Sequence, residues 1–263
     1  MTSYLESAMA IVREAGLLLR ERFGRPQKIE YKGRINIVTE ADHASEDLII
    51  NKIRALYPNH DIMTEESRGV ATGADYRWIV DPLDGTTNYA HGYPVFCVSL
   101  ALERRGTICC GAVYNPMLNE MFCAERGGGA HLNGEKIRVS ATTVLSESLL
   151  ATGFPYDIRE SDENNISYFN YMAVNAQAIR RAGSAALDMA YVAAGRFDGF
   201  WELKLMPWDT AAAWLLITEA GGSVTDLFGE PFSLQSPHVL ASNGIIHGDM
   251  KAVLSRSRHG EEK

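Results

Sequence analysis

Asp81-Pro82-Leu83-Asp84-Gly85-Thr86-Thr87-Asn88, called the central octet below, is the most informative stretch of this chain. It directly follows Trp78-Ile79-Val80, a short apolar run that predicts a buried strand. Two carboxylates leave the strand end together, and backbone N–H groups of the glycine and hydroxyl residues behind them could line an anion pocket. Hard oxygen ligands beside such a pocket suit a Mg²⁺-dependent phosphate enzyme. An isolated Asp-x-x-Asp is more often a structural turn, so acids elsewhere must decide.

Composition restricts the classes of partner. The chain has 263 residues, is 46% hydrophobic, and can bury the core of one large domain or of two closely packed halves. Its formal net charge of -8 argues against nonspecific binding to nucleic acid or to an anionic membrane. A small phosphorylated substrate stays compatible with this charge, because bound divalent cations can invert the local field.

The cysteines and the hydropathy pattern indicate a compartment. Cys97, Cys109, Cys110 and Cys123 form no Cys-x-x-Cys pair, and three of them fall in apolar, strand-like runs. We expect reduced core thiols without a zinc or redox role. The N-terminus has no charged-then-apolar leader, and no apolar run approaches the length of a membrane span. These features predict a cytoplasmic protein.

The pattern of elements changes along the chain. Before residue 153 the spacing predicts helices at about 5–23, capped by Ser3 and Glu6, and 44–56, then strands at 95–102, 107–114 and 120–124. After it we expect helices near 164–177, 184–194, 209–220 and 245–256, and strands near 197–202, 223–226 and 238–242. An α+β half (1–152) and an α/β half (153–263) would pack as a single unit around a cleft.

Two further acids are candidates to complete a metal site. Glu65 follows the apolar pair Ile62-Met63, and Asp209 lies in Pro207–Ala212 at the start of a helix rich in Ala and Leu. Taken alone, Glu65 with Glu66 is better explained as solvated loop charge. Asp209 alone is better explained as an acid at a helix N-terminus.

The motifs together resemble one family. They are Lys32–Asp42, Thr64-Glu65-Glu66-Ser67, Trp78–Asn88, Gly183-Ser184-Ala185-Ala186, Trp208-Asp209-Thr210-Ala211-Ala212 and Glu219-Ala220-Gly221-Gly222. Their order and spacing, over nearly the whole chain, are similar to the inositol monophosphatase family of lithium-sensitive, Mg²⁺-dependent sugar phosphatases. The resemblance implies a layered αβαβα sugar-phosphatase fold and a homodimer.

The resemblance also implies a set of metal ligands. By position, Glu65, Asp81, the carbonyl of Leu83, Asp84 and Asp209 match the family's ligands for two to three Mg²⁺ ions. In a site that binds two such cations, one cation lowers the pKa of a bound water, and the other neutralises charge on the ester oxygen that leaves.

Three residues match the family's catalytic groups. Thr86 resembles the hydroxyl beside the nucleophilic water, and Asp42 the acid that accepts from it; this pair would act alongside Glu65. Asp42 is equally well explained as the N-cap of the following helix. Gly85, Thr86 and Thr87 would supply N–H groups to the phosphate.

Substrate contacts are implied in the second half. The matching residues are Arg180, Gly183, Ser184, Ala185, Glu202 and Asp209; Glu202 matches a residue that binds inositol hydroxyls, and Arg180 or Arg181 lies near the site or a dimer contact. Lys204 could favour a second phosphate, but we expect it to point to solvent. Ala213 stands where the family usually has glycine, and we expect local repacking there.

The leading hypothesis is a Mg²⁺-dependent phosphomonoesterase that hydrolyses myo-inositol monophosphates. Sibling enzymes acting on fructose 1,6-bisphosphate, a 3′-phosphoadenosine nucleotide or histidinol phosphate stay open. From a different class, the fold could serve a regulatory protein that contacts transcription or RNA-processing machinery. We expect no membrane partner and no direct binding of nucleic acid.

Overall fold

The computed structural model describes residues 3–25, 28–32, 35–67 and 72–259. Its helices are α1 (Tyr4–Arg22), α2 (Glu40–Leu56), α3 (Thr86–Ala90), α4 (Ile166–Ala173), α5 (Ala185–Ala193), α6 (Pro207–Glu219) and α7 (His247–His259), with a 3₁₀ turn, η1, at Leu145–Glu147. Its strands are β1 (Ile29–Tyr31), β2 (Ile37–Thr39), β3 (Asp61–Thr64), β4 (Tyr76–Asp84), β5 (Cys97–Arg104), β6 (Thr107–Asn115), β7 (Glu120–Glu125), β8 (Gly129–Leu132), β9 (Glu135–Lys136), β10 (Leu149–Thr152), β11 (Ala178–Arg180), β12 (Gly199–Leu203), β13 (Ser223–Thr225) and β14 (His238–Ser242). Residues 33 and 34 of the Lys32–Asp42 motif lie outside the described residues.

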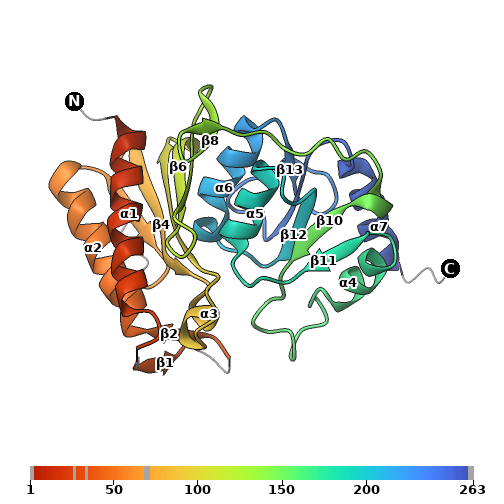
Figure 1. Ribbon diagram of the computed structural model, residues 1–263, viewed down its shortest axis with the longest axis horizontal. Helices are drawn as coiled ribbons and strands as arrows, with labels where there is room; N and C mark the ends of the chain where they lie inside the picture. Colours follow the sequence, from red (N-terminus) through yellow and green to blue (C-terminus); the bar gives the residue numbers. More distant parts are fainter. Residues whose placement is uncertain (1–2, 26–27, 33–34, 68–71, 260–263) are drawn as a thin grey trace.

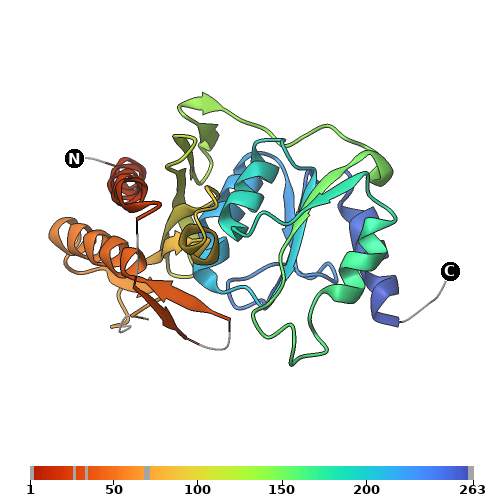
Figure 2. The same ribbon diagram turned by 60° about the horizontal axis from the view of Figure 1, so that its bottom comes forward.

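Helices and sheets alternate in five layers. Among the described residues, seven strands form one sheet in the order β3-β4-β5-β6-β7-β8-β9, and five form another in the order β11-β10-β12-β14-β13. Helices α1 and α2 cover the outer face of the first sheet, α5 and α6 lie between the sheets, and α4 and α7 cover the outer side of the second (Figures 1 and 2). The prediction of a layered αβαβα fold is confirmed.

The observed helix ends show which capping residues in the sequence set the boundaries of the helices. The capping box at Ser3 and Glu6 is present, and α1 begins at the next residue, Tyr4. Helix α2 begins at Glu40, four residues before the predicted start, because Thr39 takes the N-cap position. The predicted helix at 164–177 ends at Ala173, where a turn that closes on the carbonyl of Met172 leads into strand β11.

Close contact between α6 and the seven-stranded sheet depends on a glycine in β6. A Cβ atom at Gly111 would lie 2.8 Å from Cα of Ala212, so only glycine lets helix and strand approach this closely. Ala213, which the resemblance placed at a position where the family usually has glycine, is fully buried one position further along α6. Backbone approach between this helix and the sheet is therefore made at Gly111 and Ala212.

The prediction that the cysteines are core thiols is correct in part. All four cysteines are free thiols; Cys97, Cys110 and Cys123 are buried, whereas Cys109 is only half-buried. In the described ranges, no helix combines the length and the apolar composition that a membrane crossing needs.

Candidate active site

An irregular pairing at the end of β4 brings the two aspartates of the central octet together. Asp81 is opposite Ser99 of β5, but Asp84 is opposite Cys97, so β4 contains one residue more than its partner. Pro82 lies in this bulge, where its missing N–H costs no ladder hydrogen bond. In a regular strand residues three apart point to opposite faces. The bulge re-aims Asp84, and its charge lies close enough to raise the pKa of Asp81.

Two neighbouring elements add the other acids. Strand β3 runs parallel to β4, and Thr64 pairs with Val80, so Glu65 leaves the sheet at the same end as Asp81. Asp209 is the third residue of α6, and its Oδ2 accepts from the backbone N–H of Met206 at 2.6 Å. The expected helix-N-terminal position of Asp209 is therefore present, together with its closeness to the octet.

These four acids, Glu65, Asp81, Asp84 and Asp209, are called the carboxylate cluster below. Burial raises the pKa of Asp81 well above its ordinary value, and the charges of the other three members raise it further. Burial likewise raises the pKa of Asp209, followed by the charges of Asp84 and Glu65. Like charges in a shared low-dielectric space favour either protonation or a bound cation.

The donor set fits divalent cations of the Mg²⁺ type. The N–H of Leu83 donates to Oδ1 of Asp81 at 3.1 Å, and the N–H of Met206 donates to Oδ2 of Asp209. In each carboxylate, the second oxygen takes no part in that hydrogen bond. Oxygen donors from several carboxylates and a carbonyl are the ligands that Mg²⁺ prefers. Within the described ranges, no three His, Cys, Asp or Glu side chains already converge as a closed metal site. A cation would have to draw the carboxylate cluster together.

A hydroxyl and a carboxyl group are paired behind the cluster. The hydroxyl of Thr86 lies 2.8 Å from Oδ1 of Asp42 and 3.0 Å from the carbonyl oxygen of Leu83. Oδ2 of Asp42 accepts from the N–H and the hydroxyl of Thr39, so Asp42 is the third residue of a capping box. The alternative of Asp42 as N-cap was wrong, because the Thr39 hydroxyl occupies that role. The predicted pairing with Thr86 is present.

Asp84 also connects the seven-stranded sheet with helix α5. Its Oδ2 accepts from the hydroxyl of Ser184 at 2.6 Å and from the N–H of Ala186 at 2.8 Å, at the start of α5. Asp84 thus supplies from another element the acceptor that a helix N-terminus needs. Ser184 and Ala185, predicted to contact substrate, lie beside this carboxylate.

The backbone conformation and the close packing at position 85 require glycine. Its φ is +99°, and a Cβ atom there would lie 2.9 Å from the carbonyl oxygen of Val95. Helix α3 begins at Thr86, so the N–H groups at its first turn have no acceptor within the helix. Thr86 is buried and Thr87 is exposed. Both predicted phosphate donors lie at the start of the short helix α3.

The predicted polyol-binding carboxyl is buried beside a second acid. Burial raises the pKa of Glu202 to about 8; the charge of Asp188 raises it and the charge of Arg181 lowers it. Asp188 is 1% exposed, and among the described residues its Oδ1 has no hydrogen-bond partner. Arg180 is exposed and donates to the carbonyl of its neighbour Ile179. The structure therefore places Arg181, rather than Arg180, close to Glu202.

Two lysines form ion pairs that bear on the sequence predictions. Nζ of Lys32 lies 3.0 Å from Oε1 of Glu65 and also contacts Glu66, so these acids are not simply solvated. The charge of Lys32 lowers the pKa of Glu65, although burial, the largest cause, raises it. Lys204 is not directed to open solvent: its Nζ pairs with Asp157 at 2.6 Å. No spacing rule in the sequence indicates either contact.

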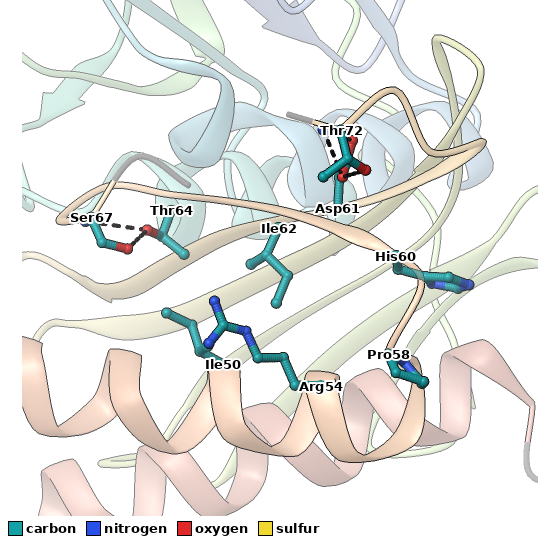
Figure 3. Close-up of a pocket in the computed structure, with 9 residues that line it drawn as sticks. All are labelled: Ile50, Arg54, Pro58, His60, Asp61, Ile62, Thr64, Ser67 and Thr72. Atoms are coloured by element: carbon teal, nitrogen blue, oxygen red, sulfur yellow. Dashed lines mark hydrogen bonds between the residues drawn. The ribbon is translucent and has the colours of Figure 1, made fainter. Parts of the chain in front are cut away.

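A cavity of about 620 Å³ lies beside β3 and α2 and outside this site (Figure 3). The described residues that line it are Ile50, Arg54, Pro58, His60, Asp61, Ile62, Thr64, Ser67 and Thr72. None of these is a predicted metal or substrate residue. The close-up shows the hydroxyls of Thr64 and Ser67 turned toward each other, as their 2.9 Å separation requires.

Comparison with known proteins identifies relatives over the full length. The chain is 42% identical over 257 residues to the inositol-1-monophosphatase of Synechocystis sp., covering 97% of this chain and 90% of that protein. It is also 42% identical to the Nus factor SuhB of Escherichia coli, covering 98% and 97% of the two chains. The solved structure of inositol monophosphatase from Anabaena sp. superposes with a TM-score of 0.89 at 42% identity, covering 96% and 95%.

The family profile gives the same assignment as the individual relatives. The profile described as "Inositol monophosphatase family" matches residues 1–261, which contain every residue of the site. On the strength of the fold, the site and these comparisons, this chain belongs to the inositol monophosphatase family.

Proposed function

We propose that the protein is a Mg²⁺-dependent phosphomonoesterase that hydrolyses myo-inositol monophosphates to inositol and phosphate. Members of the family are generally metal-dependent. The observation that carries the proposal is the carboxylate cluster at the end of β4, beside the pair formed by Thr86 and Asp42. The relatives named inositol-1-monophosphatase support the substrate.

The metal-binding roles are as follows: Glu65, Asp81, the carbonyl of Leu83, Asp84 and Asp209 hold two to three Mg²⁺ ions. When bound, Mg²⁺ supplies acidity to a water and neutralises charge on the ester oxygen that leaves. Thr86 orients that water through its hydroxyl, and Asp42 fixes the hydroxyl by accepting from it. Glu65 is the further group able to take a proton.

Substrate recognition divides between the two halves of the chain. Gly85, Thr86 and Thr87 offer N–H groups to the phosphate at the start of α3. Gly183, Ser184 and Ala185 lie at the start of α5 and face the polyol ring. Glu202, whose pKa burial raises to about 8, offers its carboxyl group to a ring hydroxyl.

A substrate screen tests the proposal. Phosphate release is measured from inositol 1-phosphate, fructose 1,6-bisphosphate and 3′-phosphoadenosine 5′-phosphate, with Mg²⁺ and with or without Li⁺. We expect the highest kcat/KM for inositol 1-phosphate, no release after chelation of Mg²⁺, and inhibition by Li⁺. Preference for another of the three assigns the protein to a sibling phosphatase, and no release from any contradicts the proposal.

The wider properties of the family complete the proposal. We further propose that the protein is a homodimer and works in the cytoplasm. Residues 1–152 would supply most metal ligands, and 153–263 would supply Asp209 and the polyol contacts, as two halves of one unit. Sedimentation of the purified protein measures the oligomeric state.

A second candidate is a regulatory role in transcription, because several relatives at 42–44% identity are named Nus factor SuhB. Asp84→Asn separates the two functions. It should abolish Mg²⁺-dependent phosphate release, whereas a purely regulatory activity would not depend on metal binding. Since Asp84 also binds the start of α5, circular dichroism must first show that the variant folds.

A further inference from the structure

The segment 153–165, between β10 and α4, is a loop whose ends are fastened together. Asn165 is 1% exposed, and its Nδ2 donates to the hydroxyl of Thr152 at 2.9 Å and to the carbonyl of Gly153 at 2.5 Å. Its Oδ1 accepts from the indole N–H of Trp201 in β12 at 2.7 Å. Compact loops with joined ends are packed by their own side chains and are frequently functional. This segment is called the 153–165 loop.

Lys204 holds the middle of the 153–165 loop. Its Nζ lies 2.6 Å from Oδ2 of Asp157 and 2.8 Å from the hydroxyl of Ser161. The Lys204 side chain is 27% exposed, and an ion pair with a second hydrogen bond at such a position is stronger than an open surface pair. Lys204 follows β12 directly, so it joins the loop to the strand that carries Glu202.

The backbone of Lys204 is unusual in a way that supports a role for its side chain. Its φ is +60°, a left-handed conformation that glycine adopts freely and other residues adopt at a cost. Such conformations persist where the surrounding structure requires them, often at ligand sites. The ammonium contacts with Asp157 and Ser161 supply a reason for lysine here.

Tyr156 precedes Asp157, the ion-pair partner of Lys204. It lies in a turn in which the N–H of Ile158 donates to the carbonyl of Pro155. Tyr156 is 58% exposed. Burial is nevertheless the largest cause that raises the pKa of its phenol, followed by the charges of all four members of the carboxylate cluster. The loop that carries Tyr156 lies against Glu202: a Cβ atom at Gly153, the first residue of the loop, would lie 2.0 Å from Oε1 of Glu202. Because Lys204, which holds the middle of the loop, is two residues beyond Glu202, the loop borders the Glu202 side of the candidate active site.

We propose that Tyr156 is a specificity-determining residue: its ring packs on the C–H face of a cyclic polyol or sugar whose phosphate lies at the carboxylate cluster, and Lys204 is the positioning residue that holds it there. This inference rests on the proposed phosphatase function. A cyclic polyol presents C–H groups on its face and hydroxyls at its rim, so an aromatic ring and the Glu202 carboxyl recognise different parts of it.

The contacts of Lys204 also bear on the choice between mono- and bisphosphates. Its ammonium is engaged by Asp157 and Ser161 and is therefore not available to a second phosphate group. The 153–165 loop therefore offers the substrate the aromatic ring of Tyr156, beside a lysine that is already paired. A phosphate monoester of a cyclic polyol fits this chemistry better than a sugar bisphosphate.

The first test compares a cyclic substrate with an acyclic one. Tyr156→Ala should raise KM for inositol 1-phosphate about tenfold, or ~1.4 kcal/mol, with kcat little changed. The kcat/KM for glycerol 2-phosphate, which has no ring face, should fall much less. Tyr156→Phe keeps the ring and should restore the KM for inositol 1-phosphate. A Phe variant as weak as the Ala variant, or equal losses on both substrates, would overturn the ring contact.

The second test addresses Lys204. Lys204→Met should raise KM for inositol 1-phosphate by a similar factor, and adding it to Tyr156→Ala should cause little further loss, because both changes remove one contact. Hydrogen exchange of residues 154–161 should be faster in Lys204→Met without any substrate present. Lys52→Met, which removes the exposed ion pair with Glu14, is the matched control and should change neither.

These outcomes separate the inference from the function on which it rests. Wild-type protein that releases phosphate from neither substrate contradicts the proposed function and the substrate role of Tyr156 with it. An active wild type with an unchanged substrate preference in Tyr156→Ala contradicts only the inference. Unchanged hydrogen exchange in Lys204→Met contradicts the role of Lys204 in holding the 153–165 loop.

Discussion

The hydroxyl of Thr86 lies 2.8 Å from Oδ1 of Asp42, although 44 residues separate them in the chain. Asp42 is fully buried and is itself oriented by Thr39, which donates to the other carboxyl oxygen from both its N–H and its hydroxyl. Helix α2 therefore fixes the direction of a hydroxyl that belongs to α3. A group held in this way loses no freedom when it orients a reacting water.

Removal of that hydroxyl should lower the rate of hydrolysis. Thr86→Val keeps the branched shape, and we expect kcat for inositol 1-phosphate to fall by ~10²–10³-fold with a small change in KM, since the hydroxyl acts on the water in the transition state. Thr86→Ser retains the hydroxyl and should keep most of the activity. Phosphate release under saturating Mg²⁺ measures both; a Val variant with wild-type kcat would refute the role.

Ser184 should affect metal affinity without being a ligand. Ser184→Ala removes a hydrogen bond of 2.6 Å to Oδ2 of Asp84. Loss of a group that orients a metal ligand typically weakens metal binding by ~10–100-fold. The Mg²⁺ concentration for half-maximal phosphate release should rise accordingly. Thr218→Ala, which removes an exposed hydroxyl bonded to Trp214 within α6, is the control; an equal shift in both variants would contradict the prediction.

Glu202 should make the protein less stable as pH rises. Its pKa is about 8 when folded, against an ordinary value of 4.5, so the folded state retains a proton that the unfolded state releases. The stabilisation is fully present below about pH 4.5 and is lost progressively up to about pH 8, with a slope of at most ~1.4 kcal/mol per pH unit from this group.

Urea unfolding of the wild type and of Glu202→Gln, in the presence of a chelator, measures this contribution. The free energy of unfolding of Glu202→Gln should fall less steeply between pH 5 and pH 8, because glutamine does not titrate. Buried acids that do not interact with Glu202 titrate alike in both proteins and cancel in the comparison, whereas Asp188 and Asp209 are coupled to its charge. Parallel curves for the two proteins would show that Glu202 ionises normally.

Gly111 should tolerate no side chain. Gly111→Ala places a Cβ atom 2.8 Å from Cα of Ala212, which forces β6 and α6 apart. We expect a loss of ~1–3 kcal/mol in the free energy of unfolding. Gly248→Ala in α7 meets no atom within 4 Å and should be neutral or slightly stabilising. Chemical denaturation compares the two, and a neutral Gly111→Ala would mean that the helix can shift without cost.

Local rules predicted what depends on neighbours in sequence. The capping box at Ser3 and Glu6 and the helix that starts around Asp209 follow from residues three or four apart. The start of α2 was misplaced because Thr39 caps the helix four residues earlier than the apolar spacing indicates. The pairing of Thr86 with Asp42 came from the family resemblance, since no periodicity relates the two positions.

Residue types along the chain were enough to assign the family and the chemistry expected of the central octet, because both follow from motifs whose order and spacing are matched over nearly the whole chain. Tertiary structure alone decided which distant groups meet them. A one-residue bulge turns Asp84 toward Asp81, and the packing of α5 makes Asp84 an acceptor for Ser184. Lys204 reaches Asp157 only because two loops fold together. Side-chain direction depends on strand register and on long-range packing, and neither has a signature in a local pattern.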